Sequence, residues 1–222
     1  MDEENNNEWY LEWIPRVSNL VSYIYPFKWT EDERRYINWL IDKWIDKDEY
    51  LWWANELWTF VHKQLEQHSL WKKIDKKNKL YKEVNKLIDN GIMFLRGVSD
   101  IRNEVYLSDD RIQGTTDIIY RYWWKLCLWD YKTYWVVKRR YWLDNKFKVD
   151  TGKRKKVQLQ LSFYAYLYEK IYNEKIEEIH LVYLHDEWYK IITLDIIPKE
   201  EIEKIIDDYY RDIINKDKYI TF

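Results

Sequence analysis

Three Asp-x-Lys triplets are the residues of this sequence whose types and spacing could hold a metal ion beside a reacting phosphate. They are Asp75-Lys-Lys77, Asp130-Tyr-Lys132 and Asp144-Asn-Lys146. The first lies in a polar run and the third in a charged segment, so we interpret both as solvated charges. The second directly follows the apolar run Leu126-Cys-Leu-Trp129. A carboxylate and an ammonium at the end of a buried strand cost free energy unless they pair or hold an ion.

A second carboxylate, Asp117, lies thirteen residues before Asp130 in the preceding predicted strand. Alternate residues of a strand share a face, so Asp130 and Lys132 lie on one side. Antiparallel pairing through the short Tyr122-Trp-Trp124 turn would bring Asp117 beside Asp130. Two carboxylates hold Mg²⁺ or Mn²⁺ through oxygen, and a lysine beside them stabilises charge or positions a nucleophile. This set suits phosphodiester hydrolysis, although a buried Asp–Lys ion pair is the alternative interpretation of the triplet alone.

Three motifs follow one another along the chain: Gly114-Thr-Thr-Asp117, Asp130-Tyr-Lys-Thr133 and Gln160-Leu-Ser-Phe-Tyr164. In order and spacing they resemble the RecB-like branch of the PD-(D/E)XK nucleases. The resemblance implies that Asp117, Asp130 and the backbone carbonyl of Tyr131 ligate metal and that Lys132 is the catalytic lysine. Gln160 and Tyr164, on one face of a helix, would steady the site and contact the scissile strand; an interior polar pair is the alternative.

Further upstream, Phe60-Val-His62 falls where this family carries a histidine on a helix. The resemblance implies that His62 is a nitrogen ligand, which favours tolerance of Mn²⁺. Trp58 stands where the family has a small glycine, so a packing role for His62 stays open. Glu104 opens a strand where relatives sometimes carry a helper carboxylate. Pro15-Arg-Val-Ser18 is similar to the Pro-Ser-Val-Thr signature of viral and mitochondrial genome maintenance exonucleases.

A basic segment follows the triplet. Nine basic and two acidic residues between Lys138 and Lys156 give a local charge of +7 in a chain with a net charge of −2. Such a patch can follow the phosphates of DNA, and a solvated loop is the alternative. We assign DNA contacts to Thr133, Arg139, Arg140, Lys153, Arg154, Lys155 and Lys156.

Composition excludes several classes of protein. The 222 residues are 46 % hydrophobic and 34 % charged, as in one folded domain. We find no apolar run long enough to span a membrane, and the acidic start is unlike a signal peptide, so we expect an intracellular, cytoplasmic protein. Its single cysteine, Cys127, excludes a disulfide framework, a four-cysteine zinc site and an iron–sulfur cluster. His68, His180 and His185 show no ligand spacing, and richness in Asn, Lys, Ile and Tyr is typical of an AT-rich genome, such as a viral one.

The predicted elements change from helical to strand-like near residue 100. Thr30-Glu-Asp-Glu33 is a predicted capping box, and Asn90-Gly91 is a predicted helix stop. Ser108-Asp-Asp110 is expected to turn a hairpin, and Pro198 to open the last helix. The expected helices cover 36–45, 49–67, 80–88, 157–172 and the residues after 198, and the expected strands cover 104–107, 112–122, 125–132, 179–184 and 189–196.

This order, helices followed by β-β-β-α-β-β-α, predicts an α/β (α+β) fold. The resemblance implies a PD-(D/E)XK restriction-endonuclease-like core, with a mixed sheet flanked by helices. Residues 1–100 would form a helical part packed on the nuclease core at 101–222. We therefore expect a metal-dependent deoxyribonuclease, acting as an exonuclease on single-stranded DNA ends. A non-cutting DNA-binding or assembly protein on the same fold is the alternative, and the sequence leaves the polarity and the oligomeric state open.

Overall fold

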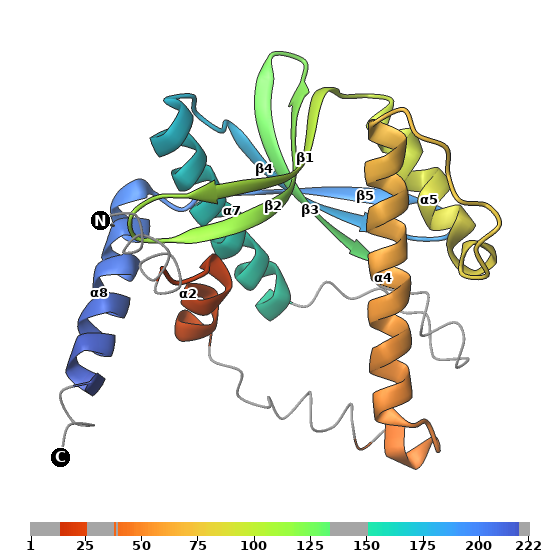
Figure 1. Ribbon diagram of the computed structural model, residues 1–222, viewed down its shortest axis with the longest axis horizontal. Helices are drawn as coiled ribbons and strands as arrows, with labels where there is room; N and C mark the ends of the chain where they lie inside the picture. Colours follow the sequence, from red (N-terminus) through yellow and green to blue (C-terminus); the bar gives the residue numbers. More distant parts are fainter. Residues whose placement is uncertain (1–13, 26–37, 39, 134–150, 218–222) are drawn as a thin grey trace, which may run out of the picture.

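The computed structural model describes residues 14–25, 38, 40–133 and 151–217 (Figure 1). A five-stranded sheet has the order β1-β2-β3-β4-β5. Its strands are β1 (Ser99–Ser108), β2 (Gln113–Tyr122), β3 (Lys125–Thr133), β4 (Glu178–Leu184) and β5 (Tyr189–Leu194). The helices are α2 (Val17–Ile24), α4 (Lys47–Ser69), α5 (Tyr81–Leu95), α7 (Thr151–Tyr172) and α8 (Lys199–Asp217).

The sheet is mixed, as the sequence predicts. β3 and β4 are parallel, and the other neighbouring strands are antiparallel. Parallel neighbours need a long crossover, and α7 supplies it. α7 runs back from the end of β3 to the start of β4. The N-terminus of α7 therefore lies at the edge of the sheet where β3 ends. The predicted order β-β-β-α-β-β-α and the mixed α/β class are confirmed.

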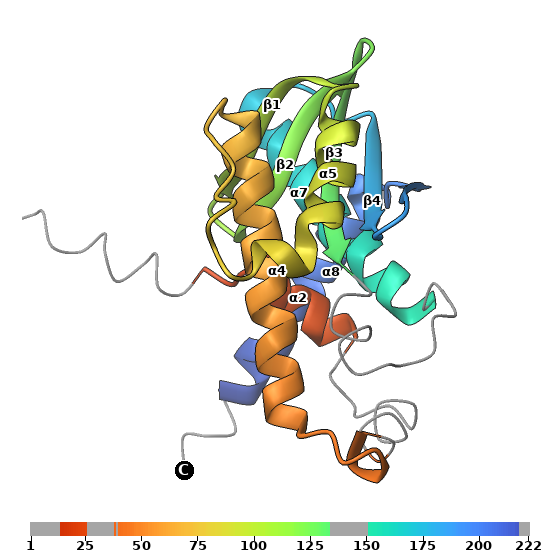
Figure 2. The ribbon, with the colours of Figure 1, turned by 90° about the vertical axis from the view of Figure 1, so that its right-hand side faces the viewer.

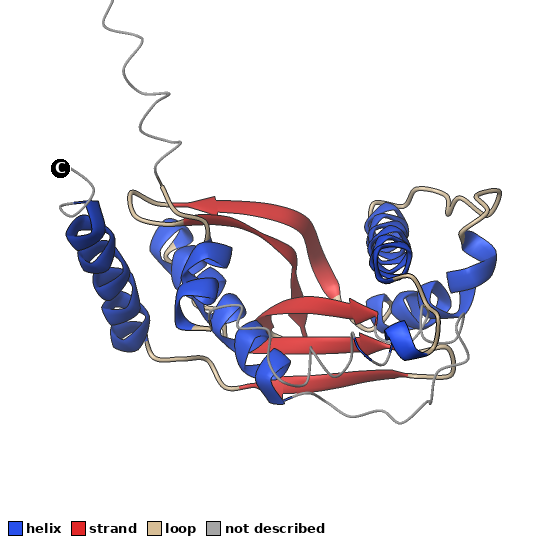
Figure 3. Cartoon of the chain, turned by 90° about the horizontal axis from the view of Figure 1, so that it is seen from below, coloured by secondary structure: helices blue, strands red, loops and turns tan. Residues whose placement is uncertain are grey.

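Helices cover both faces of the sheet. α2, α7 and α8 pack on one face, and α4 and α5 on the other. Figure 2 shows α4 and α5 in front of the sheet with α7 and α8 behind it, and Figure 3 shows the curved sheet with its helices in two separate groups. Alternation along β3 divides its side chains accordingly. Leu126 and Leu128 join the core under α7, whereas Cys127, Trp129 and Tyr131 join the core under α4 and α5.

Several predicted boundaries were wrong: β1 begins at Ser99 and not at Glu104, and α2 was not predicted. α5 continues past Asn90-Gly91 to Leu95, because Gly91 is buried against α4 and not at a helix end. A Cβ on Gly91 would lie 2.6 Å from Leu65 Cδ2, so this glycine permits close helix packing. α7 begins at Thr151, so Lys153 to Lys156 lie in its first turns and not in a loop. Lysine and arginine are good helix formers, which an interpretation based on apolar spacing overlooks.

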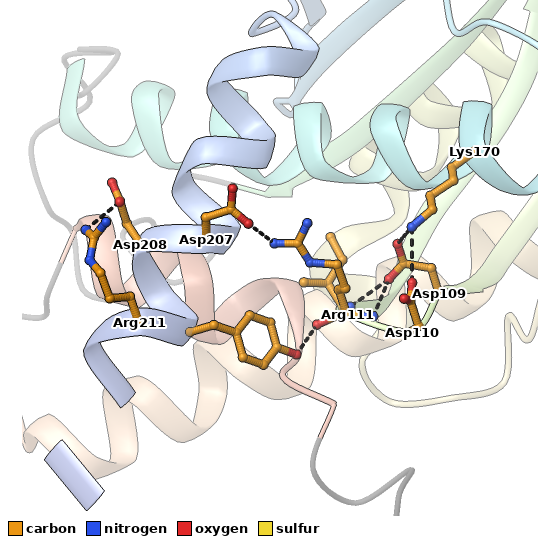
Figure 4. Close-up of polar contacts among 9 residues, drawn as sticks. Asp109, Asp110, Arg111, Lys170, Asp207, Asp208 and Arg211 are labelled. Carbon is orange, nitrogen blue, oxygen red and sulfur yellow. Dashed lines mark hydrogen bonds and ion pairs between the residues drawn. The ribbon is translucent and has the colours of Figure 1, made fainter. Parts of the chain in front are cut away.

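Charged contacts fix the β1–β2 turn to the helices behind it (Figure 4). The Lys170 ammonium of α7 lies 2.6 Å from Asp109 Oδ2 and 3.1 Å from Asp110 Oδ1. Arg111 pairs with Asp207 of α8, and the Tyr210 hydroxyl donates to the Arg111 carbonyl oxygen at 2.6 Å. These contacts hold one end of β2 in place, and that strand carries Asp117.

Some predictions fall outside the described residues, namely the Thr30–Glu33 capping box and the DNA contacts of Arg139 and Arg140. In the expected helix at 36–45, residues 38 and 40–42 are helical. Among the described residues, none of the helices is both long and apolar enough to cross a lipid bilayer.

Candidate metal centre

Three acidic residues lie in one row across the sheet. Ile118 of β2 pairs with Asn103 on one side and Trp129 on the other. Its neighbour Asp117 is therefore level with Glu104 of β1 and Asp130 of β3. Directly opposite residues of antiparallel strands project to the same face. The register thus brings three carboxylates together, although they are far apart in sequence.

Asp117 lies in the middle of this row, with Asp130 beside it on β3. Their carboxyl groups lie within hydrogen-bonding reach of each other, and Asp117 Oδ2 also accepts from the Tyr131 backbone N–H at 3.4 Å. Burial raises the pKa of Asp117 to about 6, against the opposing effect of the Lys132 charge, and Glu104 raises it further. Burial likewise raises the pKa of Asp130. Both shifts mean that ionising this pair is unfavourable without more positive charge nearby.

Lys132 supplies positive charge to the row. Its Nζ atom lies 2.6 Å from Asp130 Oδ2. This ion pair is the contact that Asp130 Oδ2 makes among the described residues, since no other donor reaches that atom. Burial by itself would lower the pKa of Lys132, but Asp130 and Asp117 offset it and the pKa is raised. Lys132 is therefore a fixed cation and a poor proton acceptor.

His62 reaches the row from α4. Its Nδ1 atom is 3.6 Å from Asp117 Oδ2, and one ligand atom each from His62, Glu104 and Asp117 lies within 4.8 Å of the other two. The imidazole is held between the rings of Trp58 and Tyr131, at centroid distances of 4.1 and 5.4 Å. Burial lowers the pKa of His62 to about 4, so the ring is neutral near physiological pH, which is the form that binds metal.

Glu104 completes the group. The sequence identifies it only as a candidate helper, but the register places it opposite Asp117. Its φ is 47°, a left-handed conformation that is uncommon for a residue with a side chain. Burial raises the pKa of Glu104, and so does the nearby Glu66. An outlier of this kind beside a cluster of carboxylates is typical of a functional site.

Tyr164 and Gln160 lie on α7 above the same strands. Gln160 Nε2 is 3.5 Å from the Tyr164 hydroxyl, and the charges of Asp117 and Asp130 contribute to the raised pKa of Tyr164, after burial. A Cβ on Gly114 would lie 2.8 Å from Tyr164 Cε1. The glycine of Gly114-Thr-Thr-Asp117 therefore leaves room for the ring that the Gln160–Tyr164 motif supplies.

The Pro15–Ser18 motif also reaches this place. The Gln113 backbone N–H donates to the Pro15 carbonyl oxygen at 3.0 Å, and Arg16 bridges to Gln113. A cavity of about 320 Å³ opens here, lined by Arg16, Val17, Ser18, Tyr106, Gln113, Gly114, Thr115 and Tyr164. Its lining is rich in hydrogen-bond donors, and Tyr164 connects it to the carboxylates.

The structure thus brings together His62, Asp117, Asp130, Lys132 and Tyr164. The Tyr131 carbonyl interacts with the His62 imidazole, while the Tyr131 side chain is buried in the core under α4 and α5. Thr133 ends β3, Arg154 and Lys155 are exposed on α7, and Lys156 is half-buried beside them. Lys153 belongs to the same helical turns.

The residues present fit a hard divalent cation. Carboxylate oxygens of Glu104 and Asp117 converge with the neutral His62 imidazole, and the register sets Asp130 beside Asp117. Such ligands suit Mg²⁺ or Mn²⁺. Two buried atoms, His62 Nε2 and Asp130 Oδ2, have no hydrogen-bond partner among the described residues. Asp130 Oδ2 is nevertheless paired with the Lys132 ammonium, and Nδ1 is the His62 nitrogen that faces Asp117. A cation beside Asp117 would stabilise the ionised carboxylates that burial disfavours.

Sequence reasoning missed a second group, made of Cys127, Glu178 and His180. Glu178 and His180 share a face of β4, two residues apart. The parallel β3–β4 register brings Cys127 beside them, which no local spacing shows.

Comparisons with known proteins do not bear on the residues of this site. The chain matches none of the protein-family models, and none of the curated proteins matches it. Among solved structures it is similar to the crystal structure of SSO0001, with a TM-score of 0.34 and 15 % sequence identity. That similarity covers 68 % of this chain and 72 % of the other.

Proposed function

We propose that this protein is a metal-dependent nuclease with a PD-(D/E)XK core, which hydrolyses phosphodiester bonds of DNA. The observation that carries the proposal is the row Glu104–Asp117–Asp130 with Lys132 and His62 at its edge. A structural ion pair would explain Asp130 and Lys132 alone. It would not explain two further carboxylates and a buried imidazole at the same place.

Each residue has a part that follows from its chemistry. Asp117, Asp130 and Glu104 would hold the cation through oxygen, and His62 through nitrogen, with the Tyr131 carbonyl beside them. A divalent cation in such a site polarises the phosphate and lowers the pKa of a bound water. Lys132 keeps its proton and lies where it can stabilise the charge that develops on the phosphate.

Single-stranded DNA is the substrate that the surroundings favour. On the outer face of α4 a shallow hollow is lined by Leu51, Trp52, Ala54, Asn55 and Trp58. Trp58 contacts His62, so this apolar face leads directly to the metal centre. Bases stack on aromatic side chains without regard to sequence, but only where the bases are unpaired.

The start of α7 supplies the phosphate contacts in this proposal. Arg154 and Lys155 are exposed, and the first turn of α7 contains no acidic residue. Positive side chains at a helix N-terminus add to the positive end of the helix dipole and are unfavourable without a counter-charge. An anion such as a DNA phosphate supplies that counter-charge. α7 starts at the edge of the sheet where β3 ends. A single strand of DNA bound to the start of α7 would therefore also reach Asp130.

The test is digestion of end-labelled single- and double-stranded DNA in Mg²⁺, Mn²⁺ or EDTA. We expect cleavage with either metal, faster on the single strand, and none in EDTA. DNA binding without cleavage in either metal would favour the non-cutting DNA-binding protein instead.

A further inference from the structure

A second group of metal-ligating side chains lies at the opposite end of β3. Cys127 is fully buried, His180 is buried and Glu178 is half-buried. One ligand atom from each of the three lies within 4.8 Å of the other two. Cys127 precedes Asp130 by three residues on β3, about 10 Å along the strand. It also projects to the other face of the sheet, so this group is separate from the carboxylate row.

The geometry of the group resembles that around a tetrahedral ion. His180 Nε2 and Glu178 Oε2 share a hydrogen bond of 3.1 Å. Two ligands bound at zinc distances of about 2.0–2.1 Å on a tetrahedron lie roughly 3.3 Å from each other. The two side chains therefore already have the separation that a shared ion requires, and the thiol of Cys127 lies on the neighbouring strand beside them.

The outer contacts of the ligands are also those of a metal site. Tyr120 hydrogen-bonds through its hydroxyl to His180 Nδ1, so Nε2 is the ring nitrogen that would bind the ion, in place of its hydrogen bond to Glu178 Oε2. Lys125 pairs with Glu178 Oε1, so Oε2, which faces His180 Nε2, is the oxygen that would bind the ion. Metal-binding histidines and carboxylates are usually oriented by such contacts through their remaining atoms.

We propose that Cys127 Sγ, His180 Nε2 and Glu178 Oε2 bind one Zn²⁺ ion, with a water molecule in the fourth position. Zn²⁺ accepts sulfur, nitrogen and oxygen ligands together, whereas the all-oxygen and imidazole set around Asp117 suits Mg²⁺ or Mn²⁺. The thiolate and the carboxylate balance the charge of the ion. Bound there, Zn²⁺ would tie the start of β3 to β4 and so support the strand that carries Asp130 and Lys132.

The rival explanation is that Tyr120, His180, Glu178 and Lys125 form only a buried hydrogen-bond network. Titration of metal-free protein with Co²⁺ separates the two. A cysteine thiolate bound to Co²⁺ gives a charge-transfer band in the near ultraviolet, and Cys127 is the one cysteine of the chain. We expect this band, and we expect equimolar Zn²⁺ to abolish it. Absence of the band would overturn the proposal, whatever the variants do.

Variants locate the ion and keep the two sites apart. Cys127→Ser should lose the band, and Asp117→Asn should keep both the band and one equivalent of Zn²⁺ after dialysis. Glu178→Gln changes a partly exposed ligand with little change of volume and should weaken Zn²⁺ binding at least about tenfold. Glu177→Gln, at an exposed neighbour outside the group, is the matched control. Equal Zn²⁺ retention by Glu178→Gln and Glu177→Gln would also contradict the site.

Discussion

Asp117 and His62 face each other at 3.6 Å, and burial displaces their pKa values in opposite directions. For Asp117 the pKa rises from 3.8 to about 6, and for His62 it falls from 6.5 to about 4. Both residues therefore prefer to be neutral in the folded, metal-free protein. A bound divalent cation reverses that preference for Asp117 and is compatible with the neutral imidazole.

The pH dependence of stability follows with a definite sign. The unfolded chain releases the Asp117 proton at a lower pH than the folded protein, so Asp117 makes folding less favourable as pH rises from about 4 to about 6. His62 has the opposite effect. Its pKa is lower in the folded protein, so it makes folding less favourable as pH falls from about 6.5 to about 4. Asp117→Asn removes only the first effect. The free energy of unfolding of this variant, relative to wild type in EDTA, should rise over that window by up to about 3 kcal/mol.

Chemical denaturation at several pH values measures this difference. Saturating Mn²⁺ should stabilise wild type most at the upper end of the window, where Asp117 is ionised and the cation offsets its buried negative charge. A difference between variant and wild type that stays flat from pH 4 to 6 would show that Asp117 is not buried as described.

His62→Gln separates a ligand from a packing residue. We expect the metal concentration for half-maximal cleavage to rise at least about tenfold, because the variant lacks the imidazole nitrogen. The melting temperature in EDTA should change little, since glutamine fills much of the same space between Trp58 and Tyr131. His68→Gln on the same helix is the control. A lower melting temperature with unchanged metal dependence would make His62 a packing residue.

At this scale the sequence predicts the part of the site that lies on one hairpin. Asp117, Asp130 and Lys132 follow from strand alternation and a short turn. The place of Glu104 depends on the β1–β2 register, which shifts between Ser99 and Arg102. A one-residue shift moves every side chain to the other face, so the sequence alone could not place Glu104 beside Asp117.

At the scale of elements, α4 must approach α5 closely for His62 to reach β2 and β3. Gly91 provides the approach, since any side chain there meets Leu65. Asn90-Gly91 can end a helix, or its glycine can let a second helix pack closely. Only the position of α4 decides between the two. Local sequence therefore misplaces the end of α5.

Gly91→Ala tests this packing. The added methyl should lower the free energy of unfolding by about 1–3 kcal/mol through overpacking. Leu65→Ala in the same chain should recover part of that loss, giving a favourable coupling in a double-mutant cycle. Gly97→Ala is the matched control, because a Cβ there meets only the Phe94 carbonyl oxygen at 3.5 Å. Additive effects of Gly91→Ala and Leu65→Ala would show that the two residues do not constrain each other.

The basic start of α7 makes a prediction about salt. Replacing Lys153, Arg154, Lys155 and Lys156 with alanine should weaken DNA binding and flatten its dependence on salt. The slope should change by about 0.7–0.9 log units for each DNA phosphate that the variant no longer neutralises. The matched control replaces Lys72, Lys73, Lys76 and Lys77, which are exposed in the loop between α4 and α5. Equal slopes for the two quadruple variants would return the α7 residues to the role of a solvated surface.

On the scale of the whole molecule, the two candidate metal sites lie at opposite ends of one strand and on opposite faces of the sheet. β3 carries Asp130 and Lys132 near its end on the α7 side, and Cys127 near its start on the α4 and α5 side. The sequence predicts the order of elements because each has its own periodicity. It does not show Cys127 beside His180, because a parallel pairing joined by a long crossover leaves no local pattern.

The most direct test of the central claim uses two Asp-x-Lys triplets of the same chain. Asp130→Asn and Asp75→Asn each remove one carboxylate charge at nearly constant volume, the first in the proposed site and the second in the exposed polar run. Single-turnover cleavage of end-labelled single-stranded DNA in Mn²⁺ should fall by about 10²–10³-fold or more for Asp130→Asn. It should stay at the wild-type rate for Asp75→Asn. Wild-type cleavage by Asp130→Asn, with both variants folded, would contradict the assignment of this row of carboxylates as the catalytic centre.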